Sequence, residues 1–290
     1  MFSPGDRSEL MRKAPAAGAD TVVFDLEDAV APGRKAEARA AVRDLLTDPT
    51  FDPDTEVCVR VTGTDAERDL AAVTDSDGRE GGDGVAGDVP FDAVMLPKAE
   101  SGEAVDRLGE RLRDHGCRVP VIALIETARG VLHAESIADA EPTDAVAFGA
   151  EDLSADLGAT RTDEGTEVLY ARETVATAAA AADVDAIDTV YTDFEDEAGL
   201  REETRFAATL GYDGKMAIHP AQVPVVNGAF TPDDGEIAWA ERVLVARDAA
   251  ATEERGVFEV DGEMIDAPLI ARAERIRDRA LAAGVEVDVE

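Results

Sequence analysis

The chain has 290 residues, with 64 Asp and Glu against 28 Lys and Arg, so its formal net charge is −36 at pH 7. Such a charge repels nucleic acids and anionic membranes, which excludes nucleic-acid-binding and membrane-bound classes of protein. Hydrophobic residues make up 45% of the chain, enough for a barrel-sized core, and no apolar stretch has the length of a membrane span.

Short apolar runs alternate with longer stretches of helical composition along the chain. The runs cover residues 21–26, 56–61, 93–96, 119–125, 145–148, 186–190 and 215–218, and the helical stretches include 35–46, 104–115 and 173–182. This alternation is typical of a parallel α/β protein, and the length suits a (β/α)₈ TIM barrel. The remaining strand fits at or before Met1, so we expect a truncated first strand or a natural start upstream.

The C-terminal part has helical composition and comes after the barrel is complete. Residues 233–252 predict one helix, and residues 268–283 predict a final helix after a turn at Asp261-Gly262. We therefore expect a barrel catalytic domain over 1–230 and a C-terminal helical extension over 231–290.

Several other features bear on location and redox state. Cys58 and Cys117 lie in or next to strand-like segments, so we expect buried free thiols rather than a disulfide or a metal site. The Gly- and Asp-rich segment 74–90 is predicted to be a solvated excursion. Met1-Phe2-Ser3-Pro4-Gly5 leads directly into charged residues, without a signal-peptide pattern, so we expect a cytoplasmic protein. The acid-rich, lysine-poor composition indicates a halophilic source.

Most of the predicted strands end at a charged or polar residue. These residues are Asp25, Glu27, Asp28, Arg60, Lys98, Glu126, Asp152, Asp193 and His219. In a (β/α)₈ barrel the C-terminal ends of the strands converge on one face, which carries the active site. The pattern therefore predicts an enzyme.

Glu126 and Asp152 follow two successive predicted strands. Two carboxylates placed in this way can converge on one hard divalent cation, and Mg²⁺ favours one or two protein carboxylates with water and substrate oxygens completing its shell. Both acids also stand where helices are predicted to begin, so N-capping is the alternative interpretation. The three histidines show no zinc-ligand spacing.

Arg60 lies in the strand-like sequence CVRV, among β-branched neighbours. A guanidinium at the barrel mouth would suit a carboxylate or α-keto acid substrate, whereas on the rim it would be solvated. The acids of the nearby sequence DLED either take part in catalysis or support the site and cap the following helix.

Phe2, Arg7 and Lys13 flank the first turn and helix. The simplest interpretation is a packed aromatic ring and two solvated cations. In a chain of this negative charge, however, cations near the mouth of a site would favour a phosphate-bearing substrate.

Nine short motifs occur in the order in which a known family has them. They are FSPG (2–5), DLEDAV (25–30), KAEAR (35–39), RV (60–61), LPKAES (96–101), ETARG (126–130), FGAEDL (148–153), GKMAIHPAQ (214–222) and DGEMIDAP (261–268). On these motifs the chain resembles the citrate lyase β-subunit-like branch of the HpcH/HpaI aldolase superfamily, which includes malyl-CoA, β-methylmalyl-CoA and citramalyl-CoA lyases. Several motifs are shared across the branch and do not fix the substrate.

The resemblance implies a (β/α)₈ barrel that depends on Mg²⁺, with Mn²⁺ as a substitute. It implies an oxo-acid lyase that reversibly cleaves a malyl-CoA-type thioester, L-malyl-CoA or β-methylmalyl-CoA, to glyoxylate plus acetyl-CoA or propionyl-CoA. The expected partners are an acyl-CoA thioester and a small α-keto acid, and the expected assembly is a homotrimer or a homohexamer.

The resemblance also implies roles for individual residues. Glu126 and Asp152 match the family's metal ligands, and Arg60 matches the arginine that holds the keto-acid carboxylate. The other positions expected to bind substrate are Phe2, Arg7, Lys13, Glu151, Asp152, Ile218 and His219. Asp266 matches an acid that reaches into a neighbouring subunit's site, where we expect it to exchange the α-proton of the thioester. Its alternative role is an N-cap of the helix predicted to begin near residue 268.

Two departures and several alternatives remain. Thr62 stands where the family usually has Asn, and the short start leaves the Phe2 contact open. The related alternatives are a citrate lyase β subunit, a citramalyl-CoA lyase and a malyl-CoA thioesterase. A non-catalytic binding protein with the same fold is disfavoured because the chain keeps Glu126, Asp152, Arg60 and Asp266.

Overall fold

A computed structural model describes residues 1–74, 91–252 and 256–287. The segment 75–90, which contains most of the predicted Gly- and Asp-rich excursion, lies outside the described residues. The chain forms two compact units, Met1–Pro224 and Val225–Glu290, and each is described by itself.

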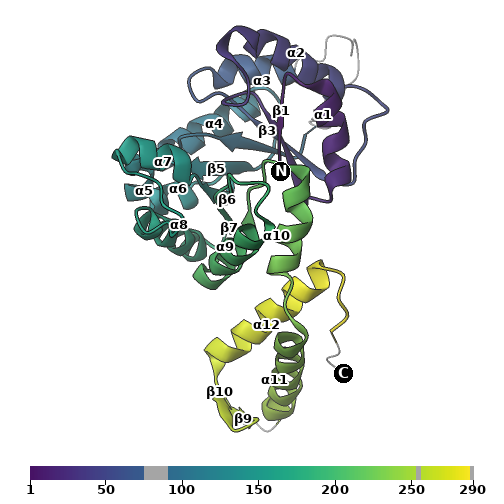
Figure 1. Ribbon diagram of the computed structural model, residues 1–290, viewed down its shortest axis with the longest axis vertical. Helices are drawn as coiled ribbons and strands as arrows, with labels where there is room; N and C mark the ends of the chain where they lie inside the picture. The colour runs from purple at the N-terminus through teal and green to yellow at the C-terminus, as the bar shows by residue number, and fades with distance from the viewer. Residues whose placement is uncertain (75–90, 253–255, 288–290) are drawn as a thin grey trace. The chain divides into compact units, whose positions relative to one another are not determined.

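The first unit is a barrel of eight parallel strands that follow one another in chain order (Figure 1). The strands are β1 (Phe2–Pro4), β2 (Thr21–Asp25), β3 (Glu56–Arg60), β4 (Ala93–Leu96), β5 (Val121–Ile125), β6 (Thr143–Phe148), β7 (Asp185–Asp188) and β8 (Gly214–Lys215). The Phe2 amide donates to the Ala217 carbonyl at 2.8 Å, which links β1 to the residues just after β8. The predicted (β/α)₈ fold with a short first strand is confirmed.

Helices connect these strands and lie outside them (Figure 1). They are α1 (Ser8–Lys13), α2 (Lys35–Leu46), α3 (Ala66–Thr74), α4 (Gly102–Asp114), α5 (Ala128–Leu132), α6 (Ala134–Ala138), α7 (Ala150–Leu157), α8 (Leu169–Ala182), α9 (Glu197–Leu210) and α10 (Val223–Phe230), with 3₁₀ turns η1 (Ala14–Ala17), η2 (Pro32–Arg34) and η3 (Pro220–Gln222). Helix α4 shows why they form. Ser101 caps its first turn by accepting the Ala104 amide, and Val105, Leu108 and Leu112 bury one helical face.

The interior of the barrel is apolar, and the strand register carries polar residues to its C-terminal end. One buried cluster collects side chains from five of the strands and from Met216: Val23, Cys58, Ala93, Met95, Leu124, Ala147 and Met216, with Phe2 of β1 and Ile187 of β7 packed against it. Asp25, the last residue of β2, pairs in register with Arg60, the last residue of β3. The two charged residues therefore emerge side by side above the apolar layer.

Both cysteines are buried free thiols, as the sequence predicts. Burial raises the pKa of the Cys58 thiol to about 12, so it is uncharged and unreactive at neutral pH.

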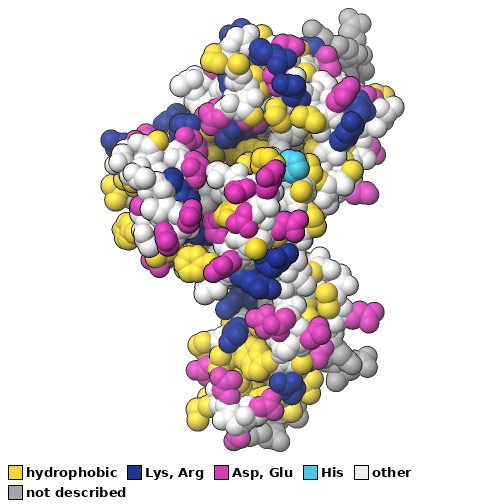
Figure 2. All heavy atoms as spheres, in the orientation of Figure 1, with side chains coloured by type: hydrophobic (Ala, Val, Ile, Leu, Met, Phe, Trp, Pro, Cys, Tyr) yellow, Lys and Arg dark blue, Asp and Glu magenta, His cyan; other side chains and the backbone are white. Residues whose placement is uncertain are grey.

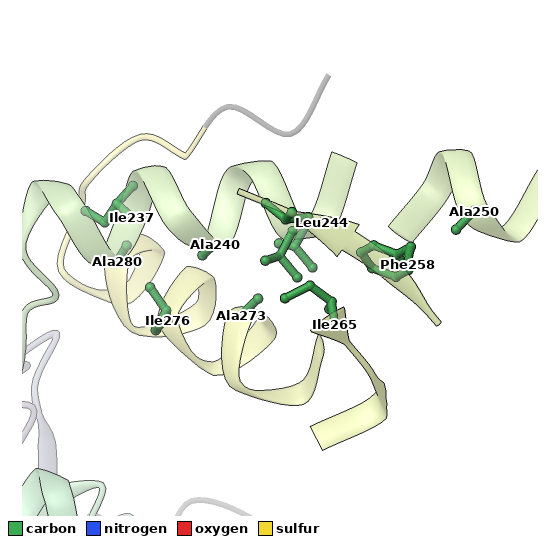
Figure 3. Close-up of a cluster of buried hydrophobic side chains, with 11 residues drawn as sticks. Ile237, Ala240, Leu244, Ala250, Phe258, Ile265, Ala273, Ile276 and Ala280 are labelled. Carbon is green, nitrogen blue, oxygen red and sulfur yellow. The ribbon is translucent and has the colours of Figure 1, made fainter. Parts of the chain in front are cut away.

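The second unit packs two helices around a short hairpin (Figure 3). Its elements after α10 are α11 (Asp234–Thr252), β9 (Phe258–Val260), β10 (Glu263–Ile265) and α12 (Ala267–Ala282). Ile237, Ala240 and Leu244 of α11 meet Ala273, Ile276 and Ala280 of α12, and Phe258 and Ile265 close the cluster.

The hairpin turns at Asp261-Gly262, where both residues have positive φ, 54° and 84°. Two successive positive φ angles characterise the type I′ turn that an Asp-Gly pair favours, because its twist matches that of the two strands. The sequence predicted this turn and both helices but not the three-residue strands on either side.

The surface reflects the acidic composition. Asp and Glu side chains are spread over the visible face with Lys and Arg between them (Figure 2). Among the described residues, none of the helices combines the length and the apolar character that crossing a membrane requires.

Candidate active site

Arg60 is held by Asp25 in a buried two-point ion pair. Its Nε and Nη2 donate to the two carboxylate oxygens of Asp25 at 2.7 and 2.6 Å. The same carboxylate accepts the backbone amides of Glu27 and Ala29 at 2.7 and 2.9 Å, so it is fully used. Parallel hydrogen bonds of this kind fix the plane of the guanidinium as well as its position.

The rest of the Arg60 guanidinium faces acids and an aromatic ring. Nη1 lies 3.4 Å from Glu27 Oε2 and 3.6 Å from Asp28 Oδ2. The guanidinium carbon lies 4.9 Å from the centre of the Phe2 ring, a cation–π contact. Burial disfavours the charged form, but Asp25 and the neighbouring acids outweigh it and raise the pKa of Arg60, so it remains a permanent cation.

Beside Arg60, one lysine stands among four carboxylates, which we call the acidic cluster: Glu27, Asp28, Glu126 and Asp152. Lys98, just after β4, places its Nζ 3.1 Å from Glu27, 3.5 Å from Asp152, 3.9 Å from Glu126 and 4.0 Å from Asp28. Its own backbone amide donates to Glu126 Oε1 at 3.0 Å. The ends of β2, β4, β5 and β6 therefore meet at one point.

Glu126 is the most deeply buried member of the acidic cluster, with 3% of its surface exposed. Burial raises the pKa of its carboxyl to about 8, against the opposing effect of Lys98. Gly149, after β6, makes room for it, because a Cβ at that position would lie 2.7 Å from Glu126 Cβ. Burial likewise raises the pKa of Glu27.

The donor chemistry of this cluster suits a hard divalent cation. Glu126 and Asp152 both lie within 4.0 Å of the Lys98 ammonium, so a single cation can reach both. Glu27 Oε2 is buried and accepts no hydrogen bond from the described residues. In the described part of the chain, no three His, Cys, Asp or Glu side chains are close enough together to hold a metal ion by themselves. Two carboxylates with open positions for water and substrate oxygens is the arrangement that Mg²⁺ favours.

The predicted substrate-binding residues at the first turn lie on the surface or under Arg60. Arg7 precedes α1 with its side chain 64% exposed, 3.7 Å from Asp6, and Lys13 is exposed at the end of the same helix. Phe2 packs beneath the Arg60 guanidinium rather than standing free.

The predicted contacts after β8 and β6 have different surroundings. Gln222 accepts the amides of Ile218 and His219, and His219 stacks on Phe194 with ring centres 5.1 Å apart. Glu151 pairs with Arg161 at 2.9 Å, away from the Lys98 contact that its neighbour Asp152 makes.

Asp266 belongs to the second unit. It is exposed at the N-cap position of α12, but its side chain forms no capping hydrogen bond with the described residues. Among these residues the capping role considered for Asp266 is therefore not realised.

The sequence pattern did not determine the roles of four residues. The acids of DLED divide their tasks, because Asp25 holds Arg60 whereas Glu27 joins the acidic cluster. Lys98 appeared only as one of several strand-end charges. Thr62 is buried, and its backbone amide and its hydroxyl both donate to Asp69 at 2.6 Å. These bonds join the end of β3 to α3. The positions of these side chains depend on strand register, which the motifs alone do not give.

Comparison with known proteins gives matches over nearly the whole chain. The model of the HpcH/HpaI aldolase/citrate lyase family matches residues 1–220. The citrate lyase subunit beta-like protein of Mycobacterium tuberculosis is 42% identical over 286 residues, covering 97% of this chain and 94% of that protein. The mitochondrial citramalyl-CoA lyase of Homo sapiens is 35% identical over 292 residues, covering 94% of this chain and 82% of that protein.

A solved structure is also similar over its full length. The crystal structure of CitE from Mycobacterium tuberculosis in complex with magnesium, acetoacetate and coenzyme A has a TM-score of 0.77 and 40% sequence identity, covering 96% of each chain.

Proposed function

Since the chain belongs to the HpcH/HpaI aldolase/citrate lyase family and is a carbon–carbon lyase, we propose that it reversibly cleaves a malyl-CoA-type thioester. The products would be glyoxylate and acetyl-CoA or propionyl-CoA. The observation that carries the proposal is the convergence of charged residues at the C-terminal end of the barrel, where Lys98 contacts Glu126 and Asp152 and shares the neighbours Glu27 and Asp28 with Arg60. This set matches what an anionic keto acid and a divalent cation need in one place.

Glu126 and Asp152 would hold Mg²⁺, as the solved relative that binds magnesium supports. When bound there, Mg²⁺ would act as a Lewis acid and as a template for the keto and carboxylate oxygens. The chain's own contribution is to keep Glu126 buried and oriented, through the Lys98 amide and the space at Gly149.

Arg60 would bind the carboxylate of the keto acid. Asp25 occupies two of the five N–H groups of the guanidinium, and the two on Nη1, which face Glu27 and Asp28, would turn to the substrate carboxylate when it binds. Asp25 and Phe2 fix the orientation of the Arg60 guanidinium. Arg60 would therefore also stabilise the negative charge that develops on the keto oxygen.

Asp266 is our candidate for the proton transfer. In the synthetic direction its carboxylate would take a proton from the α-carbon of the acyl thioester, and in cleavage it would return that proton. Its uncapped, exposed position in the second unit supports a role in the site of a neighbouring subunit within a homotrimer or homohexamer. Phe2, Arg7, Lys13, Glu151, Ile218 and His219 would line the path of the CoA thioester.

The substrate is tested by assaying the purified protein with Mg²⁺ and separating the CoA products by chromatography. Acetyl-CoA or propionyl-CoA is supplied with glyoxylate, pyruvate or oxaloacetate. We expect malyl-CoA or β-methylmalyl-CoA from the glyoxylate reactions. Citramalyl-CoA from pyruvate would instead support the activity named for the human relative, and release of free CoA with malate would indicate a thioesterase. Failure of every pair would contradict the proposal.

A further inference from the structure

Lys98 places the only charged nitrogen of its side chain at the centre of the acidic cluster. All four carboxylates lie between 3.1 and 4.0 Å from Nζ, and they come from segments that follow three different strands. The ammonium therefore occupies the position from which a cation reaches Glu126 and Asp152 together. Its side chain is 42% exposed, so it has solvent into which it can move.

The backbone at Lys98 is held in an uncommon conformation that serves this placement. Lys98 has φ of 49°, and the other described non-glycine residues with positive φ are Asp183 and Asp261. Asp183 ends a helix and Asp261 forms a hairpin turn, both of which are ordinary places for this conformation. At Lys98 the conformation instead points the amide at Glu126 while the ammonium meets the other carboxylates. Such strain persists where surrounding structure imposes it, commonly at functional sites.

The charges explain what the ammonium does there. Carboxyl groups this close disfavour one another's charged forms in a partly buried site, and Lys98 offsets that repulsion. A divalent cation bound by Glu126 and Asp152 would repel the ammonium in turn. The two cations therefore compete for one position.

We propose that Lys98 is an internal counter-cation that holds the acidic cluster in its binding geometry without metal and is displaced when a divalent cation binds. It thereby weakens and tunes metal affinity as a positioning residue. The inference rests on the proposed function, which assigns the divalent cation to Glu126 and Asp152.

The test compares three variants by Mn²⁺ titration calorimetry and by thermal unfolding without metal. Lys98→Met removes the charge, Lys98→Arg keeps it, and Arg107→Met removes a charge from the exposed surface of α4 as a matched control. We expect Lys98→Met to bind Mn²⁺ about tenfold more tightly, because a like charge has left the site. Without metal, its melting temperature should lie below that of the parent protein, and adding Mn²⁺ should remove the difference. Lys98→Arg and Arg107→Met should remain close to the parent protein in both measurements.

Unchanged or weaker Mn²⁺ binding by Lys98→Met would overturn the inference, as would an unchanged melting temperature without metal. If Lys98→Met does not fold without metal, recovery on adding Mn²⁺ supports the inference and no recovery overturns it. Mn²⁺ binding by Asp152→Asn distinguishes a failure of the Lys98 inference from a failure of the proposed metal site. If the parent protein binds no Mn²⁺, or if Asp152→Asn binds it equally well, the metal site itself is wrong and both proposals fail.

Discussion

Two of the ionic networks in the described part of the barrel differ in their balance of charge. The open network, at the C-terminal ends of β2 to β6, has the cations Arg60 and Lys98 against Asp25 and the four carboxylates of the acidic cluster. The closed network, between β7, β8 and their helices, has Arg172 and Lys215 against Asp188 and Glu203. The open network has excess negative charge and exposed members, whereas the closed network is balanced.

The closed network connects β7 and β8 to their helices through buried, mutually paired charges. Asp188 is fully buried, accepts Arg172 through two bonds of 2.8 and 2.7 Å, and accepts Lys215 at 2.6 Å. Glu203 completes the partners of Lys215 at 3.1 Å. Each charge has a partner inside the protein, so nothing is left to attract a ligand. Excess charge at a strand end therefore distinguishes the proposed ligand site from the network that stabilises the fold.

The largest expected effect is the loss of stability when the closed network is broken. Asp188→Ala would leave two buried cations without their shared carboxylate, so the free energy of unfolding should fall by about 3–5 kcal/mol. Denaturant unfolding followed by circular dichroism measures this. The matched control is Asp106→Ala on the exposed side of α4, which should change little. A loss below about 1 kcal/mol in Asp188→Ala would mean that the network does not stabilise the fold.

The next effect removes charge from the open network. Asp152→Asn should lower kcat/KM by at least about 100-fold, equivalent to about 2.7 kcal/mol, while unfolding changes little because its side chain is 44% exposed. Steady-state kinetics with the preferred substrate pair, with and without EDTA, gives the comparison, and Asp106→Asn is the surface control. Full activity in Asp152→Asn, or after EDTA treatment, would rule out the metal site.

A smaller effect is expected from Asp25→Asn, which tests whether Asp25 orients Arg60 for the substrate or only stabilises the fold. Asp25→Asn should lower kcat/KM about tenfold with a raised KM for the keto acid, because Arg60 loses its two-point hold. Asp69→Asn is the control, since Asp69 similarly binds a buried guanidinium, that of Arg39. It should cost stability while KM stays unchanged. Equal KM changes in both variants would show that Asp25 acts only through stability.

The smallest effect concerns the pH dependence of the metal-free protein. The pKa of Glu126 is raised to about 8, well above that of an unfolded carboxyl, so between about pH 5 and 8 the folded state keeps a proton that the unfolded state has lost. Its share of stability is therefore present at low pH and is lost as the pH rises toward 8. Glu126→Gln should abolish that share. Melting temperatures of both proteins in EDTA from pH 5 to 9 measure it, and parallel curves would contradict the assignment.

The sequence predicted the barrel well because each buried strand is a short apolar run between helices of clear composition. It also predicted that charged residues converge at the strand ends of the barrel, and in the structure Lys98 contacts Glu126 and Asp152 and shares Glu27 and Asp28 with Arg60. The β9–β10 hairpin was missed because three-residue strands leave too short an alternation to recognise.

The partnership of Asp25 and the position of Lys98 could not be predicted in the same way. The first depends on the register that pairs Asp25 with Arg60, and the second on a positive φ that propensity does not favour for lysine. The reach of Asp266 into another subunit depends on an assembly that one chain does not contain, and it stays a prediction.

The double use of Asp25 limits how this enzyme could be redesigned for other substrates. Its carboxylate binds the Arg60 side chain and also two backbone amides of the following loop, so any change at either residue disturbs both. A laboratory library that varied these positions would return mostly damaged proteins. Diversity is better introduced at Ile218, which is 42% exposed beyond β8 and donates its backbone amide to Gln222. A library at Ile218 would leave the pairing of Asp25 with Arg60 intact.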